Sequence, residues 1–104
     1  MTTGTKIVQL PKIQPRADIK PPPLYNVIYV NDNVTTMEFV IETLKAFFDY
    51  NEESAYGITM KIHEDGSAVV ATLPYEIAEQ KGVEITLMAR NNGFPLAIKL
   101  EPTS

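Results

Sequence analysis

Cysteine is absent from this chain, histidine occurs once, and the five glycines are scattered. Disulfides, thiolate metal sites and cysteine nucleophiles are therefore excluded. The sequence lacks the several His or Cys ligands that a zinc site needs, and no glycine-rich phosphate loop is recognisable. No run of about 18 apolar residues is present, so the sequence predicts no membrane span. The N-terminus lacks an apolar signal-peptide core, and we therefore do not expect secretion.

Charge is unevenly distributed along the 104 residues, whose formal net charge is −4. Residues 1–20 carry four basic side chains and one acidic side chain, a net of +3, which leaves −7 for the remaining chain. Nucleic-acid binding needs a basic patch to offset phosphate charge, so the acidic body argues against it. With 44% apolar residues, a chain of this length is expected to form one small domain with a single core.

The first 23 residues show no sustained hydrophobic period and contain several prolines. We predict a flexible N-terminal extension over residues 1–23, which ends in a short polyproline II spacer at Pro21–Pro23. A core domain is expected over residues 24–101.

Hydrophobic periodicity divides the core domain into six elements. The expected elements are a strand at 24–30, a helix at 36–49, a helix from the candidate N-cap Asn51 to Glu64-Asp65-Gly66, a strand at 68–73, a helix from Pro74 to Asn91-Asn92-Gly93, and a strand at 96–101. The order strand, helix, helix, strand, helix, strand predicts an α+β fold, in which a three-stranded antiparallel sheet packs against three helices. The adjacent Val69 and Val70 indicate that the second strand is central and covered on both faces.

The stretch Asn31–Glu38, between the first strand and the first helix, is the most informative part of the sequence. Such a junction gathers backbone N–H groups, short polar side chains and the first apolar residues of a helix. A small binding site could use them to hold a ligand that has a polar end and an apolar side chain. Thr35 and Glu38 also match the S/T-x-x-E capping box. Taken alone, however, Asn31-Asp32-Asn33 is more typical of an ordinary turn.

Enzymatic chemistry is disfavoured. His63 is the only histidine, and none of the three serines lies in a nucleophile-elbow context. A small hydrolase that uses His63 and Asp32 would need a nucleophile or a metal that the sequence does not provide. We therefore expect no enzyme, no metal and no cofactor.

Several separated motifs together resemble the ClpS family, the bacterial adaptors of the N-end rule. The segment from Val30 to Val40, VNDNVTTMEFV, carries the clearest resemblance. The other matching motifs are FF at 47–48, IHEDG at 62–66, EIAEQK at 76–81 and ARNNGFPL at 89–96. They follow in order and with matching spacing over roughly residues 21–101.

The resemblance implies an adaptor that captures N-degron proteins, whose first residue is a bulky hydrophobe, and delivers them to a ClpA- or ClpC-type AAA+ unfoldase for degradation by ClpP. Asn31, Asp32 and His63 would then hold the substrate's α-amino group, whose three donors require acceptors. His63 would have to be neutral, so acid should weaken binding. The implied pocket for the first side chain is formed by Thr35, Met37, Val40, Thr59, Ile62 and Leu96, which without the resemblance are more typical of a core or a turn.

Two residues depart from the family pattern. Asn33 stands where family members typically carry aspartate, which removes one negative charge near the ammonium. Thr59 stands where a pocket methionine is usual. Because threonine is shorter, β-branched and hydroxylated, we expect a larger or more polar pocket mouth and an altered first-residue specificity.

The partner surface is also implied by the resemblance. Glu76 and Lys81 match positions that contact the N-terminal domain of the unfoldase, although by themselves they are more typical of a solvated helix face. Residues 1–20 resemble the variable segment that the unfoldase engages during delivery. We expect a monomer in the bacterial cytoplasm rather than in the plastid stroma.

One alternative has a similar architecture and a different ligand. The C-terminal domain of the ribosomal stalk protein is a non-enzymatic interaction module that binds translation factors. It lacks the Asn-Asp cluster paired with a distant histidine, which is the feature that separates the two interpretations.

Overall fold

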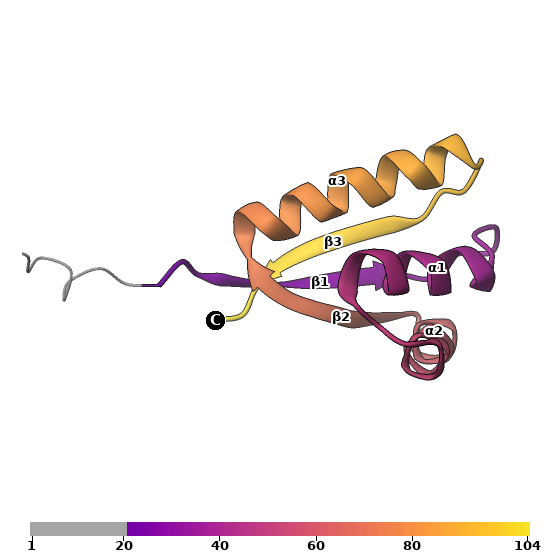
Figure 1. The fold of residues 1–104 in the computed structure, drawn as a ribbon, viewed down its shortest axis with the longest axis horizontal. Helices are drawn as coiled ribbons and strands as arrows, with labels where there is room; N and C mark the ends of the chain where they lie inside the picture. The colour runs from indigo at the N-terminus through magenta and orange to yellow at the C-terminus, as the bar shows by residue number, and fades with distance from the viewer. Residues whose placement is uncertain (1–20) are drawn as a thin grey trace, which may run out of the picture.

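The computed structural model describes residues 21–104, so the expected extension lies, up to residue 20, outside the described part of the chain. The six predicted elements occur in the predicted order (Figure 1). They are β1 Leu24–Val30, α1 Met37–Phe48, α2 Glu52–Asp65, β2 Ser67–Pro74, α3 Tyr75–Asn91 and β3 Ala97–Pro102. The predicted α+β class is therefore confirmed. The domain boundary at 24–101 stays a prediction, although the last strand ends one residue beyond it.

The sheet has the strand order β2-β1-β3, and β1 pairs antiparallel with both neighbours. The expectation that β2 is central is therefore wrong. Val69 is 45% exposed and Val70 is 5% exposed, which is the alternation of a strand that is covered on one face. The central position belongs to β1, whose Val27 and Tyr29 are fully buried.

The core lies between one face of the sheet and the helices. Val27 and Tyr29 of β1 belong to the same buried cluster as Leu44 of α1 and Ile85 of α3. On the opposite face of the sheet, the edge strands β2 and β3 expose their side chains, whereas Ile28 of the central strand is only 9% exposed. On that face the Thr72 hydroxyl donates to the Asn26 side-chain oxygen at 2.8 Å. The edges of this face are thus left to solvent, as is common in antiparallel sheets, while its centre at Ile28 is not.

Helix α1 starts one residue later than the capping-box pattern predicts. Its N-cap is Thr36, whose hydroxyl oxygen accepts the Phe39 N–H at 3.1 Å. The capping box of Thr35 and Glu38 is therefore wrong. Thr35 is held in the preceding turn because both its N–H and its hydroxyl donate to Asp32.

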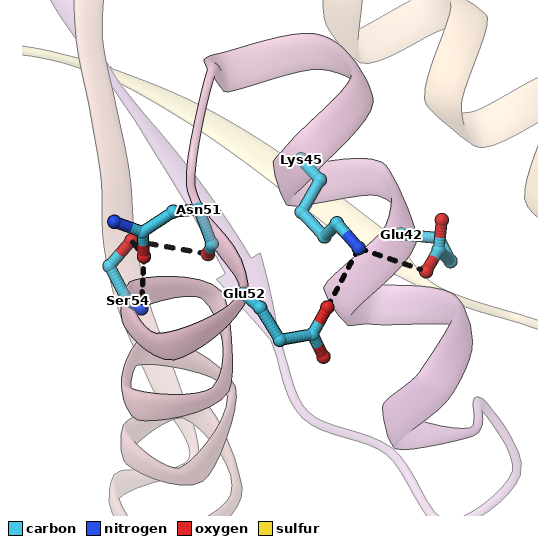
Figure 2. A network of polar contacts seen from close by, with 5 residues as sticks. All are labelled: Glu42, Lys45, Asn51, Glu52 and Ser54. Carbon is cyan, nitrogen blue, oxygen red and sulfur yellow. Dashed lines mark hydrogen bonds and ion pairs between the residues drawn. The ribbon is translucent and has the colours of Figure 1, made fainter.

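Helix α2 begins at the predicted N-cap, Asn51, whose side-chain oxygen accepts the Ser54 N–H at 2.8 Å (Figure 2). On the same side, Lys45 of α1 contacts Glu52 at 2.7 Å and Glu42 at 3.6 Å. The pair with Glu52 joins the two helices, whereas the pair with Glu42 lies within α1. Both are largely exposed and add little stability. The helix ends at Gly66, which has a left-handed backbone with φ of 89° and thereby makes the sharp turn into β2.

Helix α3 follows β3 along much of its length (Figure 1). One side of the helix faces the core, where Ala78, Ile85 and Ala89 are fully buried. Among residues 21–104, no helix is long and apolar enough to cross a membrane.

Candidate functional site

A pocket of about 260 Å³ lies where the end of β1, the start of α1 and the end of α2 meet. Its lining residues come from two segments that are far apart in the sequence, 31–40 and 59–63. They are Asn31, Asp32, Asn33, Thr35, Met37, Val40, Thr59, Ile62 and His63. Eight of the nine were predicted as site residues from the sequence, and the structure brings these eight together.

One backbone hydrogen bond joins the two segments. The Asn31 N–H donates to the Gly66 carbonyl at 2.9 Å, directly after β1 and directly after α2. The Gly66 N–H in turn donates to the Ile62 carbonyl at 2.9 Å. Ile62 and His63, in the last turn of α2, are thereby placed beside Asn31 and Asp32.

The carboxylate of Asp32 organises the turn between β1 and α1. Its Oδ1 accepts the N–H groups of Val34 at 2.8 Å and Thr35 at 2.7 Å, and its Oδ2 accepts the Thr35 hydroxyl at 2.7 Å. Burial raises the pKa of the Asp32 carboxyl, but the hydrogen bonds from Thr35 and Val34, together with the positive charge of Arg90, outweigh that effect and lower it below its ordinary value. The carboxylate is therefore ionised at neutral pH.

The carboxylate keeps capacity for a further donor. An ionised carboxylate offers about four lone-pair sites, and the turn occupies three of them. Oδ2, which has a single partner in the turn, is the oxygen with more capacity left. Asp32 can therefore hold the turn and accept from a ligand at the same time.

The pocket has an apolar floor and a polar rim. Val40, Thr59 and Ile62 are buried, whereas Asn31 and His63 are exposed and Asp32 is half-buried. An amide oxygen, a carboxylate and an imidazole nitrogen can accept from a cationic donor at the rim. The floor can cover an apolar group attached to that donor.

Thr59 contributes less polarity than its side chain would allow. Its hydroxyl donates to the Ala55 carbonyl in the same helix at 2.7 Å, and the side chain is 3% exposed. Since the donor is used within α2, the methyl group is what threonine adds to the pocket wall. Of the two expected effects of Thr59, the geometry favours a larger pocket over a more polar one.

Leu96 is the predicted pocket residue that the structure does not place among the lining residues. It is 2% exposed and belongs to the core cluster. Conversely, Asn33 lines the pocket but was considered only as a departure from the family pattern. Its place next to Asp32 in the turn was the available signal.

The two predicted partner-contact residues lie on α3, away from this pocket. Glu76 is exposed in the first turn of the helix. Lys81 is half-buried, with its ammonium 5.7 Å from the centre of the Phe48 ring. Across residues 21–104, no group of three or more His, Cys, Asp or Glu side chains is arranged to hold a metal ion.

Residues 20–99 match the model of the ATP-dependent Clp protease adaptor protein ClpS. A ClpS of Nautilia profundicola is 48% identical over 77% of this chain and 82% of its own length, and a ClpS of Shewanella loihica is 40% identical over 92% and 96%. The solved structure of Agrobacterium tumefaciens ClpS2 bound to L-phenylalaninamide is similar, with 41% identity, a TM-score of 0.75 and coverage of 79% of this chain and 99% of that one.

The turn predicts a measurable change at Asp32. Thr35→Val removes the hydroxyl donor and keeps the β-branched shape, so the pKa of Asp32 should rise toward the ordinary aspartate value of about 3.9. Carbon-detected NMR titration of the Asp32 carboxyl measures this directly. Since a lowered folded-state pKa gives stability that is lost as the pH falls through it, the parent protein should also lose more stability in acid than Thr35→Val.

Thr86→Val, a change of the same kind in α3, is the control and should leave the Asp32 titration unchanged. An Asp32 pKa that does not respond to Thr35→Val would contradict the assigned role of the hydroxyl.

Proposed function

Because the chain belongs to the ClpS family of Clp protease adaptors, we propose that its pocket binds the free α-amino group and the bulky hydrophobic first side chain of N-degron proteins. The observation that carries the proposal is that Asn31, Asp32 and His63 lie together at the rim of one pocket whose floor is apolar. L-Phenylalaninamide, the ligand of the similar ClpS2 structure, has the same two parts, a free amine and an apolar side chain.

Simple energetics indicate that both parts of the ligand are needed. Burial of a Leu or Phe side chain contributes roughly 1.5–3 kcal/mol, and a hydrogen bond to a charged group contributes about 1.5–3 kcal/mol. Association costs several kcal/mol in lost freedom. Neither the side chain nor the amine is sufficient alone, so we expect micromolar affinity that requires both.

The amine requirement gives the decisive test. A labelled peptide that begins with a free Phe should bind at least about tenfold more tightly than its N-acetylated copy, because acetylation removes the charge and two donors. Fluorescence anisotropy titration at pH 7 measures both.

A peptide that begins with free Asp provides the matched control for the apolar floor and should bind weakly. Equal affinity for the free and acetylated Phe peptides, or no binding of either, would overturn the proposed function.

Thr59 is proposed to widen the choice of first residue. A threonine methyl fills less space than the methionine that is usual in the family. Thr59 lies on the floor of the pocket, opposite the polar rim, where it would contact the first side chain of the substrate. β-branched first residues such as Ile and Val are therefore expected to be accepted alongside Leu and Phe.

Thr59→Met should narrow this choice. The affinity ratio of peptides beginning with Val and with Leu should fall at least about fivefold, since pocket volume changes of this size are worth 1–3 kcal/mol. Thr59→Val is the control: it replaces the hydroxyl, which donates to the Ala55 carbonyl, with a methyl group of similar size, and should keep the parent's ranking. An unchanged ranking in Thr59→Met would refute the role of Thr59.

Delivery to a ClpA- or ClpC-type unfoldase, through its N-terminal domain, is the second half of the proposed function. ClpP would degrade what the unfoldase translocates, and the adaptor itself would catalyse no reaction. Glu76 and Lys81 are the proposed contacts, and since neither lines the pocket, a bound first residue would not cover them. We place the protein as a monomer in the bacterial cytoplasm, where this machinery operates.

Charge reversal tests the contact surface. Glu76→Lys combined with Lys81→Glu should weaken binding to the isolated N-terminal domain of the unfoldase at least about tenfold, because like charges then meet across the interface. The affinity for the free Phe peptide should stay the same. Isothermal titration calorimetry measures both, with Glu84→Lys, an exposed charge reversal on the same helix, as the control. Undiminished binding of the double variant would exclude these two residues as contacts.

A further inference from the structure

Arg90, in the last turn of α3, forms hydrogen bonds to the segment that connects α3 to β3. Its Nη1 donates to the carbonyl of Phe94 at 2.9 Å and to the carbonyl of Leu96 at 3.0 Å. Pro95 between them has no N–H to donate. One guanidinium nitrogen, which carries two N–H donors, therefore holds both carbonyls of this short segment.

The segment held by Arg90 packs against the helix that supplies the pocket wall. The Phe94 ring meets the Phe39 ring edge-on, with centroids 5.1 Å apart. Phe39 lies in the first turn of α1, between Met37 and Val40, and both of these line the pocket. A displacement of Phe94 would therefore act on the turn from which these two pocket residues project.

We propose that Arg90 is a positioning residue for the first-side-chain pocket, which it supports through the contact of Phe94 with Phe39. The inference rests on the proposed function, since it concerns the selectivity of the same pocket. Arg90 does not touch the ligand in this role. Its hydrogen bonds fix the segment at 94–96, the segment fixes the first turn of α1, and that turn fixes the shape available to the first side chain.

The charge of Arg90 has the wrong sign for a direct part in binding. Its positive charge acts on Asp32, at the rim where a substrate ammonium would lie, and like charges repel. Attraction of the ligand therefore does not explain an arginine at this place, whereas support of the connecting segment does. Loss of the Arg90 charge should slightly strengthen binding of the substrate's amine, while loss of its hydrogen bonds should make the shape of the first-side-chain pocket less well defined.

Selectivity distinguishes positioning from general stability. In Arg90→Met, the ratio of the affinities for peptides beginning with Phe and with Ala should fall at least about fivefold toward unity. A variant that is only less folded would lose affinity for both peptides by one common factor, which leaves the ratio unchanged. Arg90→Lys, which keeps the charge and several N–H donors on a more flexible stem, should restore part of the ratio.

Two further measurements make the test specific. Lys99→Met removes a positive charge from β3 without touching the 94–96 segment and should keep the parent's ratio. In a Phe39→Leu background, Arg90→Met should have a smaller effect on the ratio, because the two act through one contact. If Arg90→Met does not fold, Phe94→Leu takes its place with the same expected loss.

The outcomes separate this inference from the proposed function. A parent that prefers the free Phe peptide to its acetylated copy, with an unchanged Phe-to-Ala ratio in Arg90→Met or in Phe94→Leu, would overturn the role of Arg90 and leave the function standing. A parent that does not distinguish the two Phe peptides would overturn both.

Discussion

The ionised carboxylate of Asp32 is the group on which the rest of the site depends. It accepts from Val34 and Thr35, and these bonds shape the turn that leads from the central strand into α1. The turn decides that the helix starts after Thr36 and that Met37 and Val40 project from its first turn. The same carboxylate retains capacity for a ligand donor, so one charged group both builds the pocket and equips its rim.

Asparagine, aspartate and histidine can meet at one rim because the ends of two elements coincide. The bond from Asn31 to the Gly66 carbonyl joins the end of β1 to the end of α2, and the left-handed Gly66 makes the reversal into β2 possible. The two parts of the pocket differ in burial: the polar groups remain accessible at the mouth, and the buried Val40, Thr59 and Ile62 form the floor. A pocket of this kind suits a ligand that is cationic at one end and apolar at the other, as ClpS membership leads us to propose.

Sequence patterns predicted the element order because each segment has a strong local period and a clear boundary signal at each end. In α2, Asn51 marks the start of the helix and Gly66 marks its end. They failed where another hydrogen bond, or the position of a strand in the sheet, competes with the local pattern. Thr35 matched a capping box but is bound by Asp32, so Thr36 caps the helix instead. The apolar pair Val69-Val70 indicated a central strand, yet β2 lies at the edge of the sheet and exposes Val69.

By itself, the sequence determined the α+β class, the ClpS resemblance and eight of the nine residues that line the pocket, since these follow from local periodicity and from motifs in register. Only the tertiary structure decided where each side chain is used. Burial places Leu96 in the core rather than in the pocket lining, and a bond to Ala55 withdraws the Thr59 hydroxyl from the pocket. Both outcomes depend on atoms that other parts of the fold, or another turn of the helix, bring within hydrogen-bonding or van der Waals distance, and residue types along the chain do not encode such distances.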